Sequence, residues 1–217
     1  MRPALLVFAV VAALLTGCAH SDEQGPRAAT APSTAAGAPL SPVPRAAPES
    51  IEIPKIGAKS SLIPKGLTPT GAFDVPDVSQ PLQAVWYCDQ AQPGPPISCK
   101  SGVLPGQVGP AIIAGHVDGS PTSPKGPHQK GIFYRLHELE VGDTVMIHLV
   151  DGTLLTFAVY RVLKSAKTQF PQSVTSGGVT SVPELRLITC TGPFVGGQMG
   201  YADNLIVFAT LIPNVPS

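Results

Sequence analysis

The chain has 217 residues, of which 43% are hydrophobic, so it is long enough to bury one sizeable core. It carries 14 Lys and Arg against 14 Asp and Glu, and this balance gives no net field that would favour nucleic acid or an anionic membrane surface. The 25 prolines and 22 glycines are typical of a loop-rich β protein with an extended segment, and they argue against a helical bundle.

Residues 1–18 have the organisation of an export signal, with basic Arg2, an apolar stretch over Ala4–Leu15 and then Cys18. The apolar stretch is shorter than the roughly 20 residues that span a bilayer. The segment Leu15–Cys18 resembles the bacterial lipobox, in which the cysteine is lipidated and becomes the mature N-terminus. The alternatives are an uncleaved signal-anchor and ordinary cleavage nearby. In each case we expect the folded part to lie outside the cytoplasm.

Composition changes after the signal, because half of residues 19–48 are Ala or Pro. Such a segment lacks the apolar side chains that would offset the entropy lost on ordering. We therefore expect a disordered tether over residues 19–48. As a coil it would hold a folded domain, residues 49–217, roughly 30 Å from the membrane.

From residue 49 onward, β-prone runs alternate with Gly and Pro turns, and a short helix is expected only over residues 133–139. The sequence predicts strands at Ser50–Pro54, Lys59–Ile63, Ala72–Val75, Ala111–Ala114, Thr144–Val150, Leu154–Leu163, Glu184–Cys190 and Leu205–Leu211. Asp151 and Gly152 form a strong hairpin signal. Seven or eight strands at this spacing predict an all-β fold, a closed or nearly closed barrel.

The sequence around each of the four cysteines suggests its role. If Cys18 carries lipid, three remain, and an odd number in an exported protein leaves one thiol over. Cys88 and Cys99 flank ten Pro- and Gly-rich residues that nothing else in the sequence would order. We predict a disulfide between them, which would stabilise the fold by about 3 kcal/mol. Two free thiols are the alternative. A metal-binding pair is not, because the spacing lacks a metal-ligand signature. Cys190 is then the unpaired thiol.

Cys190 and His116 each follow an apolar run, at Leu185–Ile188 and Ala111–Ala114. An isolated cysteine is more often a small core residue than a nucleophile. The position of Cys190 at the predicted end of a strand instead favours access to solvent. A catalytic thiol needs a base or a cationic neighbour, because at a pKa of about 8.5 little of it is thiolate at neutral pH. Of the five histidines, His116 is the one at the exit of a buried strand.

Four motifs follow one another along the chain: Ile53-Pro54-Lys55-Ile56-Gly57, Gly115-His116-Val117-Asp118, Leu187-Ile188-Thr189-Cys190 and Tyr201-Ala202-Asp203-Asn204. Together they resemble the sortase transpeptidases, most closely the actinobacterial class F group, over about residues 51–211. The resemblance implies a closed eight-stranded β-barrel with one or two short helices. It also implies that a cysteine attacks a C-terminal sorting motif of the Leu-Pro-x-Thr-Gly type. A thioester forms, and an amine of the cell wall or of another protein receives the acyl group, without a cofactor.

By the same resemblance, Cys190 is the nucleophile and His116 is the acid or base that protonates the leaving amine. Many sortases carry an arginine on the strand after the cysteine, and this sequence has Asn204 there. An amide donates hydrogen bonds but brings no charge. Three sources of oxyanion stabilisation therefore stay open: Asn204, an arginine from elsewhere such as Arg186 or Arg135, or backbone N–H groups alone.

Asp118 and Thr189 are further candidates for substrate binding. The Asp118 carboxylate would orient His116, bind a peptide or only cap a turn, and the Thr189 hydroxyl would hold substrate or merely reflect β propensity. A metal site on His116, Asp118 and Cys190 lacks clustered ligand spacing. The expected partners are secreted proteins with a sorting motif, an amine acceptor and the membrane, through an N-terminal lipid or signal-anchor, but no nucleic acid. The alternatives are a non-catalytic lipid-anchored binding module, a degenerate sortase and a cysteine peptidase that uses water.

Overall fold

The computed structural model describes residues 45–69, 71, 73–92, 97–121, 127–170, 174, 181–196 and 200–213. The predicted export signal, Cys18 and residues 19–44 of the predicted tether lie outside these ranges. The end of that tether belongs to the fold, because Ala46 packs against the core and the Ala47 carbonyl accepts a hydrogen bond from the Val150 N–H. No helix in the described ranges has the length and hydropathy needed to cross a membrane.

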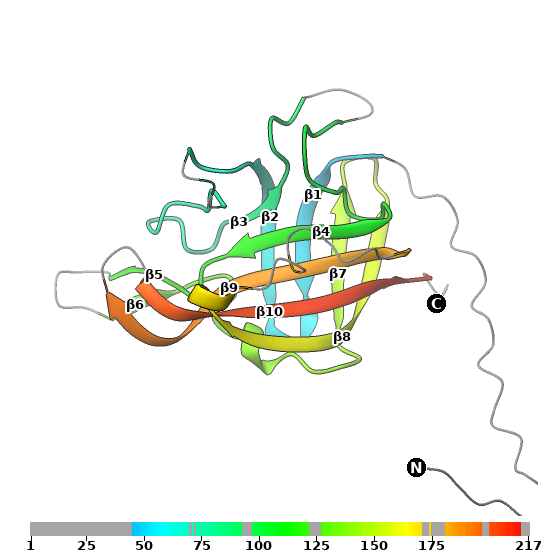
Figure 1. Ribbon diagram of the computed structural model, residues 1–217. Coiled ribbons are helices and arrows are strands. Elements are labelled where there is room, and N and C mark those ends of the chain that lie inside the picture. The colour runs from blue at the N-terminus through cyan, green and yellow to red at the C-terminus, as the bar shows by residue number, and fades with distance from the viewer. Residues whose placement is uncertain are drawn as a thin grey trace, which may run out of the picture. The chain divides into compact units, whose positions relative to one another are not determined.

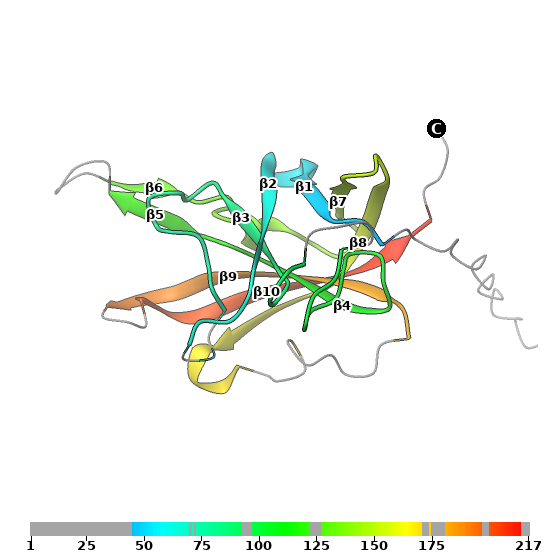
Figure 2. The same ribbon diagram turned by 90° about the horizontal axis from the view of Figure 1, so that it is seen from above.

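Eight strands close into a barrel, in the order β1-β2-β3-β4-β9-β10-β8-β7 (Figure 1). They are β1 (Pro48–Ile53), β2 (Ala58–Lys65), β3 (Ala84–Tyr87), β4 (Gly109–Gly115), β7 (Thr144–Leu149), β8 (Leu154–Ala166), β9 (Pro183–Gly196) and β10 (Gly200–Ile212). The prediction of an all-β closed barrel is confirmed. A separate two-stranded sheet consists of β5 (Asp118–Pro121) and β6 (His128–Lys130). Figure 2 shows this sheet at the same end of the molecule as the tips of β9 and β10.

The helical segments among the described residues are short 3-10 turns: η1 (Pro54–Ile56), η2 (Leu136–Glu138) and η3 (Lys167–Gln169). The helix expected over residues 133–139 is reduced to η2, because the Leu136 N–H donates to the Phe133 carbonyl, three residues back, and the backbone is extended again at Leu139. The strand predicted at 72–75 is wrong. Phe73 makes only an isolated bridge to Leu67, and residue 72 lies outside the described ranges.

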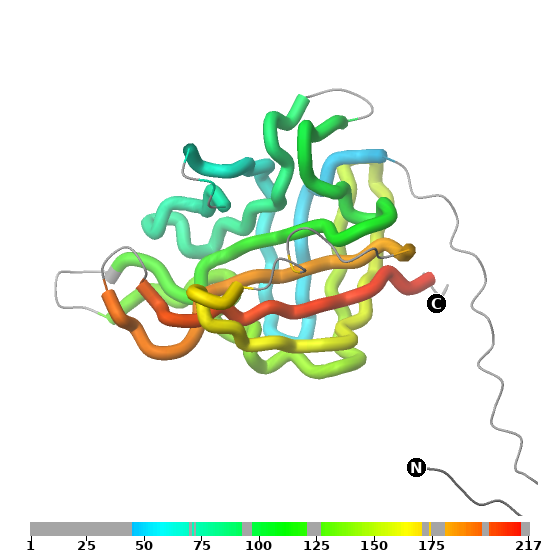
Figure 3. The backbone as a smooth tube through the Cα atoms, in the orientation of Figure 1, coloured from blue at the N-terminus to red at the C-terminus, as the bar shows by residue number. Residues whose placement is uncertain are grey.

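The first half of β9, Pro183–Thr189, is buried on both faces, which explains why its sequence is mainly apolar. Leu185 and Leu187 point into the barrel and belong to the main core. Ile188 lies on the outer face, in a second apolar cluster that includes Ile206 and Phe208. Figure 3 follows the chain from β8 into η3, which turns back over the outer face of β10 and β9. The outer cluster and η3 together border the pocket of the candidate site.

Cys88 and Cys99 form a disulfide in the structure, and Cys190 is a free, half-buried cysteine. Next to the disulfide, the Asp89 N–H donates to the Ser101 carbonyl, 2.9 Å away. The crosslink therefore closes the Pro- and Gly-rich loop against the end of β3. It also leaves Cys190 as the one unpaired cysteine among the described residues.

Candidate active site

The parallel pairing of β4 with β9 brings His116 and Cys190 to the same end of the barrel. The register runs from Gly109 opposite Pro183 to Ala114 opposite Ile188. His116 and Cys190 each lie two residues beyond that last pair, so they are level with each other. Because neighbouring strands are about 4.8 Å apart, this register places the two side chains at adjacent positions.

Strand β9 does not end at Cys190, as the sequence predicted, but continues to Gly196 as a hairpin with β10. The pairing with β4, by contrast, stops at Ile188. Beyond that point, one edge of β9 no longer has a barrel partner. Cys190 is therefore accessible because its neighbour strand ends, and not because its own strand does.

Close backbone packing holds His116 in place. The His116 carbonyl accepts the Phe133 N–H, and the Gly131 N–H donates to the Val117 carbonyl, 2.9 Å away. A Cβ atom on Gly131 would lie 2.1 Å from the His116 carbonyl oxygen. Gly115 is equally restricted, because a Cβ there would lie 2.6 Å from Ile132. Two glycines thus allow the loop after β6 to press against the backbone that carries the histidine.

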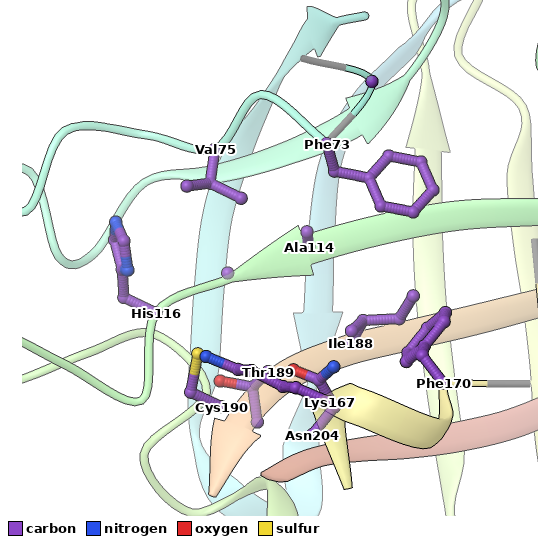
Figure 4. A pocket seen from close by; sticks show the side chains of 12 residues that line it. Phe73, Val75, Ala114, His116, Lys167, Phe170, Ile188, Thr189, Cys190 and Asn204 are labelled. Atoms are coloured by element: carbon purple, nitrogen blue, oxygen red, sulfur yellow. The ribbon is translucent and has the colours of Figure 1, made fainter. Parts of the chain in front are cut away.

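The His116 ring is directed away from the thiol in this structure. Its Nε2 atom lies 2.6 Å from the Pro76 carbonyl oxygen, and because a carbonyl only accepts, Nε2 carries the proton. Figure 4 shows the ring rising toward the segment of Val75, above Cys190. No hydrogen bond joins these two described side chains. The imidazole and the thiol line the same pocket but share no hydrogen bond.

A pocket of about 550 Å³ opens beside the pair (Figure 4). Its described lining consists mainly of small or apolar residues from β4, β9, β10 and the segments that follow β2, β4 and β8: Gly71, Phe73, Val75, Ala114, Gly115, His116, Lys167, Phe170, Ile188, Thr189, Cys190 and Asn204. The ring of Phe73 packs edge-on against Tyr87, with centroids 5.1 Å apart. The pocket suits an extended ligand with apolar side chains whose backbone passes the thiol.

Asn204 lies directly opposite Cys190 in the register between β10 and β9. Directly opposed residues project to the same face of a sheet, and Asn204 lines the pocket as Cys190 does. Its amide is thus available to a group bound at the sulfur. Of the side chains that the sequence offered for the oxyanion, Asn204 is the one that lines the pocket.

The two arginines considered from sequence are held elsewhere. Arg186 is 4% exposed, pairs with Glu184 and lies 4.5 Å from the centre of the Phe208 ring. Arg135 pairs with Glu138 at 2.6 Å and donates to the Ile56 carbonyl. Neither arginine is among the described residues that line the pocket.

The Asp118 carboxylate accepts a hydrogen bond from the Tyr201 hydroxyl and has no bond to His116 in the described structure. This hydrogen bond is the largest cause that raises the pKa of Tyr201 to about 12, followed by burial and by the charges of Asp118 and Cys190. Asp118 therefore joins β5 to the β9–β10 hairpin beside the thiol. The hypothesis that it orients His116 has no support in this arrangement.

A different carboxylate lies near the histidine. The pKa of Asp77 is lowered, mainly by its hydrogen bonds with Ser79 and to a small extent by the charge of His116. Asp77 directly follows Pro76, whose carbonyl accepts from the His116 ring. Sequence reasoning missed this acid, because it lies in a turn about forty residues before the histidine.

Thr189 borders the pocket, but its side chain belongs to the inward series of β9. The residue is 4% exposed and is paired with Leu205 of the main core. Its hydroxyl oxygen is buried and has no hydrogen-bond partner among the described residues. This burial argues against a contact between that hydroxyl and a peptide in the pocket.

Lys167, Phe170, Phe73 and Val75 line the pocket and were not predicted from the sequence. They follow strands β8 and β2 at positions that carry no motif, so only the fold reveals them. No three of the His, Cys, Asp and Glu side chains in the described ranges form a group that would hold a metal ion.

The fold and the site together define a β-barrel protein with a histidine just beyond the end of β4 and a cysteine level with it on the parallel strand β9. A sequence model of the family described as Sortase domain matches residues 51–212, which is more than half of the chain. The chain belongs to the sortase family. No curated protein matches the sequence.

Solved structures of sortases share the fold. Sortase A from Corynebacterium diphtheriae is 18% identical with a TM-score of 0.51, over 81% of this chain and 64% of that one. Streptococcus agalactiae sortase C1, in complex with MTSET, is 18% identical with a TM-score of 0.52, over 80% and 72%. Sortase C-1 from Actinomyces oris is 19% identical with a TM-score of 0.51, over 76% and 73%. This chain thus spans slightly less than two thirds of the Corynebacterium protein.

Proposed function

We propose that this protein is an extracytoplasmic cysteine transpeptidase. It cleaves a C-terminal sorting motif of the Leu-Pro-x-Thr-Gly type in a secreted protein and joins the shortened end to an amine of the cell wall or of another protein. The observation that carries this proposal is the level placement of His116 and Cys190 beside an apolar pocket. Membership of the sortase family supports the same class of reaction.

In the proposed reaction, His116 first turns from the Pro76 carbonyl toward Cys190 and takes the thiol proton, which leaves a thiolate and an imidazolium. The thiolate of Cys190 attacks the carbonyl carbon of the scissile peptide bond, and the electron pair of that carbonyl moves onto its oxygen. The Asn204 amide donates a hydrogen bond to this oxyanion. When the intermediate collapses, the C–N bond breaks, and the His116 imidazolium gives its proton to the leaving amine.

The remaining acyl group is a thioester on Cys190. An amine acceptor attacks its carbonyl carbon, the C–S bond breaks and an amide forms. Of the two protons that an incoming ammonium group loses, one returns to His116 and one goes to solvent. This restores the thiolate and the imidazolium for the next cycle.

Intact mass measurement tests the proposal with the full chain and a panel of sorting-motif peptides. The wild type should gain the mass of the acyl fragment, and Cys190→Ala should not. Addition of an amine should convert the acyl-enzyme into an amide product. Hydrolysis despite the amine would indicate a cysteine peptidase. The absence of an adduct with every peptide, together with a thiol inert to alkylation, would indicate a binding module.

We also propose that Cys18 is lipidated and anchors the domain to the outer face of the membrane. The support is the lipobox-like end of the apolar segment and the Ala- and Pro-rich residues that follow it. In a bacterial host that processes lipoproteins, Cys18→Ala should move the protein from the membrane fraction to the soluble fraction. Retention in the membrane would instead indicate a signal-anchor.

A further inference from the structure

A positively charged neighbour favours the thiolate form of a catalytic cysteine and stabilises the oxyanion that the substrate carbonyl becomes when the thiolate attacks it. Asn204, opposite Cys190, supplies only hydrogen bonds. Arg186 and Arg135 are committed to Glu184 and Glu138. None of these three side chains therefore places a cation next to the thiol.

Lys167 is the only lysine or arginine among the described residues that line the pocket. It is the first residue of η3 and directly follows the end of β8. In the sheet, Ser165 of β8 pairs with Asn204, and Asn204 pairs with Cys190. Ser165 is therefore two strands from the cysteine, about 10 Å across the sheet, and Lys167 follows it by two residues, so a long side chain is suited to bridge the span.

The Lys167 side chain is directed across the pocket toward Cys190. Figure 4 shows it extended, with its amino group pointing toward the thiol. The residue is half-buried, and its surroundings in the pocket include the apolar side chains of Phe170 and Ile188. In such a weakly polar environment, a charge acts on its neighbour more strongly than in water.

We propose that Lys167 is a catalytic residue of this protein, whose ammonium group stabilises the negative charge on the Cys190 sulfur and then on the oxyanion. The proposal rests on the proposed function. In the attack step, the negative charge moves from the sulfur to the carbonyl oxygen of the substrate, and Lys167 stays beside both atoms. It transfers no proton, so the proton of the leaving amine still comes from His116.

Other charged groups near the thiol have different partners or positions. The Tyr201 hydroxyl donates to Asp118 on the β5 side. Asp203, which precedes Asn204, pairs with Lys164 at 3.0 Å. Lys164 lies on β8, only three residues before Lys167, and is not among the described pocket residues. It therefore provides a matched control, in which an equal charge is removed from the same segment.

The test compares Lys167→Met, Lys167→Arg and Lys164→Met in the full chain. Peptide mapping by mass spectrometry follows the alkylation of Cys190 by iodoacetamide across a pH series, and single-turnover measurements follow acylation by a sorting peptide. Lys167→Met should move the midpoint of alkylation to higher pH and slow acylation about 10²-fold. Lys167→Arg should retain most of the thiol reactivity and most of the acylation rate. Lys164→Met should match the wild type. Thermal unfolding verifies that each variant is folded.

The outcomes separate this inference from the proposed function. Acylation and alkylation of Lys167→Met that match the wild type would overturn the role of Lys167. A higher KM for the peptide with unchanged acylation at saturation and unchanged alkylation would also overturn it, because Lys167 would then only bind substrate. An equal loss in Lys164→Met would mean a diffuse charge effect. If the wild type forms no acyl-enzyme, the proposed function fails, whereas the alkylation series still tests the link between Lys167 and Cys190.

Discussion

At Arg186 the outer face of β9 is filled, whereas at Cys190, four residues further along, the same face opens into the pocket. Arg186 has Glu184 and the Phe208 ring against it, and the Tyr160 hydroxyl donates to Glu184 at 2.8 Å. Around Cys190 no comparable partner fills the space in the described structure, and β4 no longer pairs with β9.

This difference shows that position on a face does not decide the role of a side chain. Arg186 and Cys190 have the same parity on β9, yet one is a structural ion-pair member and the other is open to a ligand. The arginine is enclosed by its own neighbours in what we call the filled half of β9. The open half is the part around Cys190, and a lysine from another segment borders it. Four substitutions test this contrast.

The largest expected effect comes from Cys190→Ala in the open half. Thioester formation should be lost entirely, because no other described residue at the site supplies a thiol. The free energy of unfolding should change by no more than about 0.5 kcal/mol, since the side chain is only half-buried. Intact mass and urea denaturation measure the two quantities. A large loss of stability would mean that Cys190 is a core residue and that the two halves are alike.

Arg186→Met should produce the opposite pattern in the filled half. Removal of the guanidinium leaves the buried Glu184 carboxylate without its charge partner, so we expect a loss of about 3 kcal/mol in the free energy of unfolding. Acylation per folded molecule should persist. The double variant Arg186→Met with Glu184→Gln should recover most of the stability, which urea denaturation would reveal. Loss of acylation in a stable Arg186→Met protein would give this arginine a catalytic role.

Phe170→Ala should weaken substrate binding at the pocket wall. Phe170 is half-buried and lines the pocket, so its loss should raise the KM for a sorting peptide about fivefold, equivalent to about 1 kcal/mol. Phe194→Ala is the control, because Phe194 is 66% exposed on the β9 hairpin and is not among the described pocket residues. Steady-state kinetics compares the two. Equal effects would show that the pocket does not receive the peptide.

The smallest expected effect is on pH dependence, at the contact between Tyr201 and Asp118. The pKa of Tyr201 is raised from 10.0 to about 12 in the folded protein. Between these values the unfolded chain loses the phenol proton while the folded chain keeps it, so stability should fall as pH rises through this range. The contribution is fully present below pH 10. Tyr201→Phe should lack this alkaline decrease, which urea denaturation across the pH range would measure.

Local sequence patterns were sufficient for the strands that carry the site. The run at 111–114 is continuously apolar and the run at 185–188 is apolar apart from Arg186, because both faces of their strands are covered, and they correspond to parts of β4 and β9. The hairpin around Asp151 and Gly152 also follows from the sequence, since its turn chemistry is local. By contrast, β3 has only four residues, and β5 and β6 have four and three, too few for a periodic signal.

The sequence by itself determined which residues have the necessary chemistry. It identified Cys190 as the thiol left over once Cys88 and Cys99 are paired, and His116 as the histidine at the end of a buried strand. Only the tertiary structure decided which residues meet. The parallel register makes His116 and Cys190 level, and the turn after β8 brings Lys167 into the pocket.

The same limit explains the residues whose roles the sequence left open. Whether Arg186 reaches a pocket, whether Thr189 faces the core and whether Asp118 bonds to Tyr201 each depend on the strand that lies alongside. Neighbours of that kind are separated by many residues in the chain. The physical reason is that side-chain identity is local, whereas strand pairing and the burial of each face are set by the whole barrel.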